Sequence, residues 1–219
     1  MQTIQTASMD RPRSKYLVDP FIDLMQISLQ IKASMLSKAI FLDRDGTLNV
    51  EKGYITNPAE IKLYPNSGAV LNRFRIQGKL VIIISNQSAI GRGLMTVDQF
   101  EQVNQALWDL LRQRGAGYDA LYYCPHVPDK ICECRKPRPG LILQAALDFN
   151  IDLSASYFIG DKLSDIEAGQ RAGCQTILVR TGFGRESEKQ VGKVKPSCVQ
   201  DDLPEALAWI TERENNRYG

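Results

Sequence analysis

The sequence predicts an α/β fold with a central, mainly parallel β-sheet that is covered by helices on both faces. From Lys38 onward, short apolar segments alternate with longer segments of helical periodicity, which is typical of a parallel sheet with crossover helices. Of the 219 residues, 43% are hydrophobic and 24% are charged, as in an ordinary globular domain. We therefore expect one domain at 38–213, an N-terminal extension of unknown role at 1–37 and a C-terminal tail at 214–219.

Five apolar segments are expected to form the strands of the sheet. Each is short, rich in aliphatic or aromatic residues, and followed by polar residues. The longest aliphatic run, at 80–84, has the length of a buried strand and is far from the roughly 20 residues that span a membrane. The expected strands are 39–43, 80–85, 120–124, 156–160 and 176–180.

Helices are expected between these strands. The second of them has the clearest boundaries, because Thr96 and Gln99 have the spacing of a capping box and Gly115 follows the last apolar position. The expected helices are about 67–77, 97–114, 140–149, 164–172 and 204–213.

Composition excludes several classes of function. The net charge of +2 argues against a dedicated nucleic-acid-binding protein, which usually has a strongly basic face. The single histidine, His126, makes a serine or cysteine triad difficult, since a triad needs a free histidine. The five cysteines lack the spacing of a disulfide framework, and the N-terminus lacks a signal-peptide pattern. We expect a cytoplasmic protein with reduced thiols, and Met35, just before the first strand, leaves open a start of translation there.

Polar residues follow the expected strands at positions that suit catalysis. Asp43 and Asp45 end the first strand, Ser85 ends the second, Lys136 comes after the third, and Asp161 follows the fourth. The carboxyl ends of parallel strands meet at one edge of a sheet. Paired carboxylates suit either a hard cation or an acid together with a nucleophile. A solvated turn is the alternative for two such residues, but the convergence of carboxylates, a hydroxyl and cations favours an active site.

A cluster of cysteines and the histidine predicts a structural zinc site in the loop 124–134. Residues two apart in an extended chain share a face, so each of the two pairs presents both ligands to one point. Four protein ligands leave no open position on a tetrahedral Zn²⁺, so this ion would be structural. The alternative is a coincidental cluster of buried thiols. The expected ligands are Cys124, His126, Cys132 and Cys134.

These motifs resemble the four ordered motifs of the haloacid dehalogenase-like phosphohydrolases. The matching segments are 43–47, 85–87, Lys136 and 160–165, and the resemblance extends over about 38–184. It implies a Rossmann-like three-layer sandwich with a central, mainly parallel sheet. Only one helix separates the first two expected strands, so we expect no cap domain and one zinc-binding loop.

The resemblance implies a role for each motif residue. Asp43 would be the nucleophile that forms an aspartyl-phosphate, and Asp45 would protonate the leaving alcohol and then activate water. Ser85 and Lys136 would stabilise the phosphoryl group. A catalytic Mg²⁺ would be held by the carboxylates of Asp43 and Asp161 and by the backbone carbonyl of Asp45.

Within this family, the zinc-loop segment 124–137 resembles that of the capless D-glycero-D-manno-heptose 1,7-bisphosphate 7-phosphatases. The resemblance implies removal of the C7 phosphate to give heptose 1-phosphate, in lipopolysaccharide or nucleotide-heptose biosynthesis. We expect a monomer that acts on a small phosphorylated sugar and binds neither nucleic acid nor membrane. The substrate-contacting residues would be Arg44, Glu51, Lys52, Gly53, Tyr54, Asn86, Gln87, Ser88, Arg135 and Lys162.

Two alternatives remain open at this point. Histidinol-phosphate phosphatases share the zinc-loop type, so histidinol phosphate or another small sugar phosphate is the second substrate candidate. A catalytically inactive, zinc-stabilised binding module is the alternative from another class. The intact Asp43, Asp45, Lys136 and Asp161 favour an enzyme.

Overall fold

The computed structural model describes residues 36–216 of the chain. Residues 1–35, which make up almost all of the expected extension and include Met35, lie outside the described residues, as do 217–219. No helix in the described part of the chain is long and apolar enough to cross a membrane.

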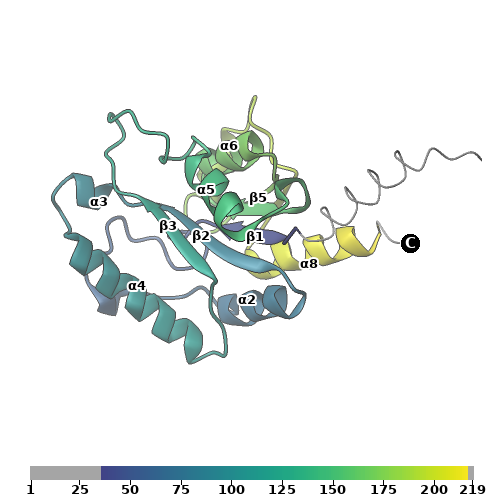
Figure 1. Ribbon diagram of the computed structural model, residues 1–219, viewed down its shortest axis with the longest axis horizontal. Helices are drawn as coiled ribbons and strands as arrows, with labels where there is room; N and C mark the ends of the chain where they lie inside the picture. Colours follow the sequence, from purple (N-terminus) through teal and green to yellow (C-terminus); the bar gives the residue numbers. More distant parts are fainter. Residues whose placement is uncertain (1–35, 217–219) are drawn as a thin grey trace, which may run out of the picture. The chain divides into compact units, whose positions relative to one another are not determined.

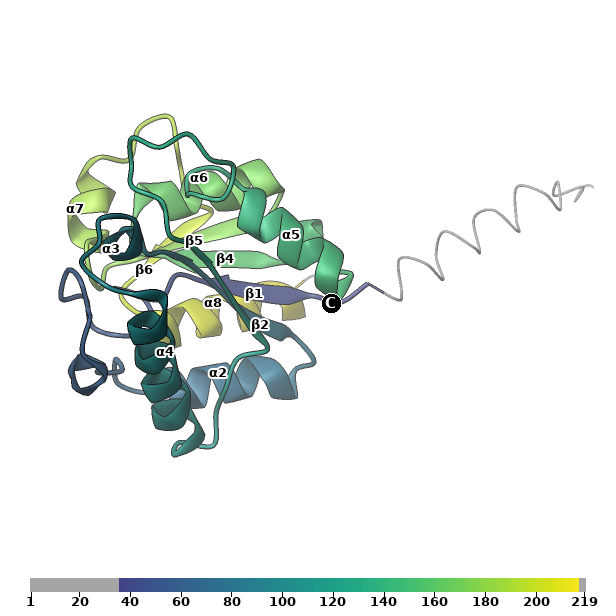
Figure 2. The ribbon, with the colours of Figure 1, turned by 60° about the vertical axis from the view of Figure 1, so that its left-hand side comes forward.

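The expected parallel sheet is confirmed, and it has six strands in the order β3-β2-β1-β4-β5-β6. Every neighbouring pair is parallel, and β1 lies between β2 and β4 in the middle of the sheet. Figure 1 shows β1, β2 and β3, and Figure 2 shows β1 between β2 and β4. The sixth strand is absent from the sequence prediction, because it is a three-residue edge strand of half-buried residues with too little pattern to detect. The strands are β1 (Ala39–Leu42), β2 (Leu80–Asn86), β3 (Ala120–Cys124), β4 (Tyr157–Gly160), β5 (Gln175–Val179) and β6 (Cys198–Gln200).

Helices cover both faces of the sheet, so the three-layer arrangement is confirmed. In Figure 2, α5 and α6 lie on one side of the strands, and α2, α4 and α8 lie on the other. Two short helices, α3 and α7, were not expected from the sequence. The bounds are η1 (Pro58–Glu60), α2 (Ser67–Ile76), α3 (Ser88–Gly91), α4 (Val97–Arg112), α5 (Gly140–Phe149), η2 (Leu153–Ala155), α6 (Leu163–Ala172), α7 (Gly184–Lys189) and α8 (Leu203–Asn215).

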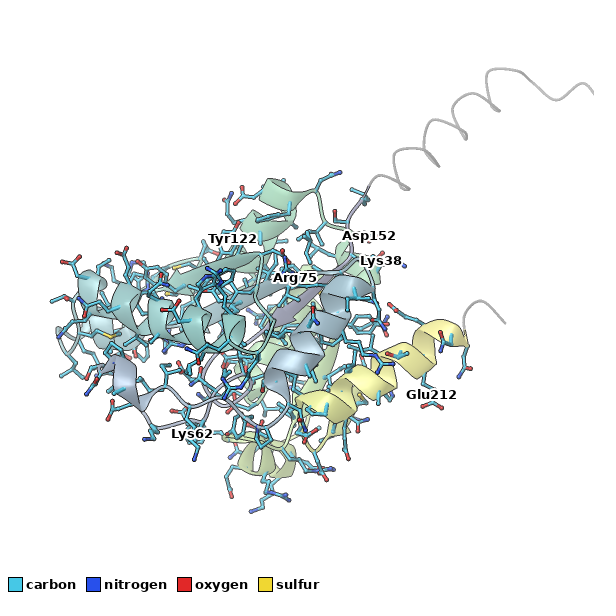
Figure 3. The ribbon with its side chains drawn as sticks, turned by 90° about the horizontal axis from the view of Figure 1, so that it is seen from below. Lys38, Lys62, Arg75, Tyr122, Asp152 and Glu212 are labelled. Atoms are coloured by element: carbon cyan, nitrogen blue, oxygen red, sulfur yellow. The ribbon has the colours of Figure 1, made fainter. Side chains whose placement is uncertain are left out.

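Each face of the sheet has its own hydrophobic core. Alternate strand residues point to opposite faces, so Ile40 and Leu42 pack under α2, α4 and α8, whereas Ala39 and Phe41 pack under α5 and α6. Burial of these apolar side chains on both faces fixes the position and orientation of β1 in the sheet. Exposed charged residues such as Lys62 and Glu212 extend outward from the surface (Figure 3).

The connections near the carboxyl edge agree with a capless domain. Between β1 and β2 the chain forms only η1, α2 and their loops. The capping box of α4 is present: Thr96 Oγ1 accepts from the Gln99 backbone N–H, and the Gln99 side chain accepts from that of Thr96. The last helix, α8, continues to Asn215, two residues beyond the expected end of the domain at 213.

Candidate active site

Side chains from several strand ends surround one cavity of about 440 Å³ at the carboxyl edge of the sheet. A larger cavity of about 660 Å³ between α2 and α8 has no acidic cluster in its lining. Most residues expected from the sequence line the smaller cavity, and Asp161 is completely buried beside it. The lining residues are Asp43, Asp45, Glu51, Gly53, Tyr54, Ser85, Asn86, Gln87, Ser88, Arg135, Lys136, Lys162, Ser164, Asp165 and Phe183.

Lys136 is the buried cation at the floor of this cavity, with 4% of its surface exposed. Its Nζ lies 2.8 Å from Asp43 Oδ1 and 2.7 Å from Asp165 Oδ1. It also donates to the carbonyl of Ile84, at 2.8 Å, in β2. Burial acts to lower the pKa of Lys136, but the two carboxylates outweigh burial and raise it. The ammonium group is therefore fixed in place and charged.

Burial and mutual repulsion raise the pKa of two carboxyl groups at the site. Burial raises the pKa of Asp43 to about 6, against the opposing effect of Lys136. Burial, together with the charges of Asp43 and Asp165, raises the pKa of Asp161 to about 8. Such shifts mean that the carboxylates lack compensating positive charge.

The arrangement of these carboxylates fits a hard divalent cation. Oxygen atoms of Asp43, Asp161 and Asp165 all lie within 4.8 Å of one another. The buried Oδ1 of Asp161 has no hydrogen-bond partner among the described residues, although buried acceptors are normally paired. Carboxylate oxygens are the ligands that Mg²⁺ prefers, so the donor set suits Mg²⁺.

Glycines make room for the Asp161 carboxylate. A Cβ atom at either Gly46 or Gly182 would lie 2.2 Å from Asp161 Oδ2. The same oxygen accepts a hydrogen bond of 2.8 Å from the Phe183 backbone N–H, and Thr181 Oγ1 donates to the Gly46 carbonyl at 2.6 Å. The segment 181–183 after β5 therefore holds the Asp161 carboxylate in place against the loop that contains Gly46.

Asp45 is bound on both carboxylate oxygens. Asn49 Nδ2 donates to Oδ1 at 2.9 Å, and Gln87 Nε2 donates to Oδ2 at 2.8 Å. Arg44 Nη2 also donates to Oδ2, at 2.8 Å. Burial alone would raise the pKa of Asp45, but the charge and hydrogen bonds of Arg44 outweigh burial, so the pKa of Asp45 is lowered. Gln87 Nε2 also lies 2.8 Å from Ser85 Oγ, so it connects Asp45 to the hydroxyl of β2.

The predicted zinc ligands converge in the loop after β3. Cys124 Sγ lies 3.2 Å from Cys134 Sγ, 3.8 Å from Cys132 Sγ and 3.5 Å from His126 Nδ1. Ligand atoms each about 2.3 Å from one tetrahedral ion lie about 3.8 Å apart, so one Zn²⁺ fits among the four ligands. Arg135 Nη1 donates to the His126 carbonyl at 3.0 Å, so the loop also fixes Arg135 beside the cavity.

Known proteins share both the sequence and the fold. The HAD-hydrolase-like family model matches residues 133–206. The D-glycero-beta-D-manno-heptose-1,7-bisphosphate 7-phosphatase of Haemophilus ducreyi is 41% identical over 184 residues, which cover 80% of this chain and 100% of that protein. The chain belongs to this family of HAD-like hydrolases.

Other members of the heptose-bisphosphate phosphatase family are also similar to this chain. The Escherichia coli enzyme is 38% identical over 179 residues, which cover 77% of this chain and 93% of that protein. The crystal structure of D,D-heptose 1,7-bisphosphate phosphatase from B. bronchiseptica, complexed with magnesium and phosphate, superposes with a TM-score of 0.77. That enzyme is 33% identical, and the match covers 80% of this chain and 99% of that one.

In this member of the family, an ion pair crosses the mouth of the cavity. Lys162 Nζ lies 3.2 Å from Glu51 Oε2 and 4.6 Å from the centre of the Phe183 ring. Burial acts to lower the pKa of Lys162, but the surrounding carboxylates outweigh it and raise the pKa. Tyr54 also lines the cavity and is 49% exposed, which leaves its ring accessible to a ligand.

Two residues expected to contact substrate do not line the cavity. Lys52 is exposed to solvent. Arg44 is only 1% exposed, because its guanidinium group is turned into the protein, towards Asp45 and Asn104.

The sequence interpretation missed three of the lining residues, Ser164, Asp165 and Phe183. The sequence did contain a signal for Asp165, because this residue lies in the same short motif as Gly160. In the structure the two residues are in close contact, since a Cβ at Gly160 would lie 2.4 Å from Asp165 Cβ. The sequence contained no signal for Phe183, because its place in the cavity lining depends on how the chain folds after β5.

Proposed function

We propose that the chain is a Mg²⁺-dependent phosphatase that removes the C7 phosphate of D-glycero-D-manno-heptose 1,7-bisphosphate and leaves heptose 1-phosphate. One observation carries the chemistry: Asp43 and Lys136 line one cavity, and the unpaired oxygen of Asp161 lies beside them. The activity of the relatives supports the substrate. Free cysteines support a reducing, cytoplasmic location, and we propose that the enzyme acts as a monomer.

Asp43 is the nucleophile of this proposal. Its Oδ1 accepts from the Arg44 backbone N–H at 2.8 Å and is paired with Lys136. These contacts fix the carboxylate and leave Oδ2 for in-line attack on phosphorus, which forms an aspartyl-phosphate and breaks the bond to the sugar oxygen. Lys136 and the Ser85 hydroxyl stabilise the charge of the transferring group. Mg²⁺, held by Asp43, Asp161 and the Asp45 carbonyl, would neutralise phosphoryl charge.

Asp45 is the general acid and base. In the first step Asp45 acts in its protonated form, which the charge of Arg44 disfavours in the free protein, and donates a proton to the leaving sugar oxygen. In the second step the carboxylate takes a proton from the water that hydrolyses the aspartyl-phosphate. The group needs no histidine for either step. The single histidine of the chain is thereby left for the zinc loop, which we propose has a structural role.

At the rim of the cavity, the proposed sugar contacts are Glu51, Gly53, Tyr54 and the polar residues 86–88. Arg135 and Lys162 would approach the phosphate groups, since they are the other cations in the lining.

The test is phosphate release with heptose bisphosphate, fructose bisphosphate and histidinol phosphate as a panel. We expect the heptose bisphosphate to have the highest kcat/KM, and phosphorus NMR of the product to show that the C1 phosphate is retained. Asp43→Asn is expected to abolish release. Turnover by that variant would refute the nucleophile assignment, and preference for histidinol phosphate would refute the substrate assignment.

A further inference from the structure

Arg44 is a buried arginine in which each of the three guanidinium nitrogens has a hydrogen-bond partner. It separates the two aspartates of the first motif, and only 1% of its surface is exposed. Its Nε lies 3.1 Å from both carboxylate oxygens of Asp45, and its Nη2 lies 2.8 Å from Oδ2. Because the planar guanidinium group meets the planar carboxylate along one edge, it fixes both the position and the rotation of Asp45.

The opposite side of the guanidinium group is held by α4. Arg44 Nη1 donates to Asn104 Oδ1 at 2.8 Å, and the Arg44 Cζ lies 5.5 Å from the centre of the Phe100 ring. Phe100 is buried, and α4 is anchored by its capping box and by the core. The chain of contacts therefore runs from a rigid helix through Asn104 and Arg44 to Asp45.

Burying an arginine is costly unless its hydrogen bonds are satisfied. The Asn104 amide oxygen satisfies the side of the group that Asp45 does not reach. Arg44 does not line the cavity, so direct contact with substrate does not explain it. The hydrogen-bond partners of Arg44 instead indicate that it holds the Asp45 carboxylate in place.

We propose that Arg44 and Asn104 are positioning residues that hold the Asp45 carboxyl group at the leaving oxygen of the substrate. The proposal rests on the proposed function, because it assigns them a role only through Asp45 as acid and base. A general acid must be within hydrogen-bond reach of the atom that it protonates, and a displacement of about 1 Å can cost roughly a hundredfold in rate.

The experiment compares two substrates in single turnovers with excess enzyme. The sugar bisphosphate has a poor leaving group that needs the proton of Asp45, whereas dinitrophenyl phosphate has a good leaving group that needs none. Release of the leaving group reports only the first step for both. The variant is Asn104→Leu, which removes the acceptor at nearly constant volume. The matched control is Gln105→Leu, the same type of change at the next, exposed position of α4.

We expect Asn104→Leu to slow release of the sugar monophosphate about 10- to 100-fold and to leave dinitrophenolate release within about twofold. Asn104→Asp, which keeps the acceptor oxygen, should restore most of the sugar-phosphate rate. Gln105→Leu should leave both rates unchanged. Equal slowing with both substrates, or no slowing with either, would overturn the proposal.

Two further variants keep the result interpretable. If Asn104→Leu does not fold, Arg44→Lys tests the same idea, since an ammonium group cannot contact Asp45 along an edge and Asn104 at once. It should slow the sugar substrate selectively, and equal slowing of both substrates again overturns the proposal. Asp43→Asn is expected to abolish dinitrophenolate release. Release by Asp43→Asn would refute the proposed function itself, separately from the role of Asn104.

Discussion

Gly182→Ala is the sharpest available perturbation of the cation site, because it acts on Asp161 from outside the sequence motifs. Gly182 has φ of +53°, and a residue with a Cβ costs about 1–2 kcal/mol in the left-handed region. The new Cβ would lie 2.2 Å from Asp161 Oδ2 and 2.6 Å from Gly46 Cα. Such overlap costs a further ~1–3 kcal/mol. We expect Gly182→Ala to lower the free energy of unfolding by about 2–5 kcal/mol.

Gly93→Ala provides the matched control for backbone strain. Gly93 has φ of +70°, and no atom lies within 4 Å of a Cβ built there. The control should therefore lose only the cost of the left-handed conformation, about 1–2 kcal/mol. For a domain of this size, each 1 kcal/mol lowers Tm by roughly 2–4 °C, so thermal denaturation separates the two variants.

Calorimetric titration with Mg²⁺ measures the effect on the site itself. Displacement of the Asp161 carboxylate should weaken Mg²⁺ binding at least about tenfold in Gly182→Ala, and Gly93→Ala should bind as the wild type does. Equal Tm values for the two variants, together with Mg²⁺ affinities within about twofold of each other, would refute the placement of Asp161 between these glycines.

Three more outcomes are expected. Cys132→Ala, or removal of zinc by a chelator, should lower phosphatase activity because the loop fixes Arg135 beside the cavity; full activity after adding back Mg²⁺ alone would contradict this. Glu214→Gln should lower the free energy of unfolding by about 1–3 kcal/mol, measured in urea, because the buried Lys79 ammonium loses the negative charge of the partner that lies 2.7 Å away; an unchanged midpoint would argue against the pair. Burial raises the pKa of the Cys174 thiol to about 12, so iodoacetamide at pH 8 should alkylate this thiol far more slowly in the native than in the unfolded protein. Mass spectrometry measures the two rates, and equal rates would contradict burial.

The parts of the fold with strong periodic patterns were predictable from the sequence. The central strand β1 is fully apolar, β2 begins with a run of five aliphatic residues, and α4 has both a capping box and a regular apolar stripe. The boundaries of these three elements are therefore within two residues of expectation. The edge strand β6 and the short helix α7 were missed. Both form through contacts with β5 and have no apolar period of their own.

The candidate site was predictable wherever a strand delivers a side chain directly. Asp43, Ser85 and Asp161 come from strand ends, and the parallel topology alone brings such ends together. The direction of a side chain was not predictable in the same way. Arg44 follows Asp43 in the chain, yet its contact with Asn104 depends on how α4 packs, which residue spacing does not specify.

Charge balance links the two outer ion pairs of the site to its need for a metal. Arg44 pairs with Asp45, and Lys162 pairs with Glu51. The Arg44 pair is close to neutral, whereas the charge of Lys162 is shared between Glu51 and the inner carboxylates, because it also acts to lower the pKa of Asp43 and Asp161. A phosphate group that approaches Lys162 must compete with Glu51, which is 3.2 Å away.

The inner groups are then left with excess negative charge. Three carboxylates, those of Asp43, Asp161 and Asp165, surround the single ammonium group of Lys136, which leaves two net negative charges when all are ionised. That excess contributes to the pKa of about 6 at Asp43 and about 8 at Asp161, and it would repel a phosphate dianion. One divalent cation cancels it, so metal and substrate should bind cooperatively, and phosphate should bind poorly to metal-free protein.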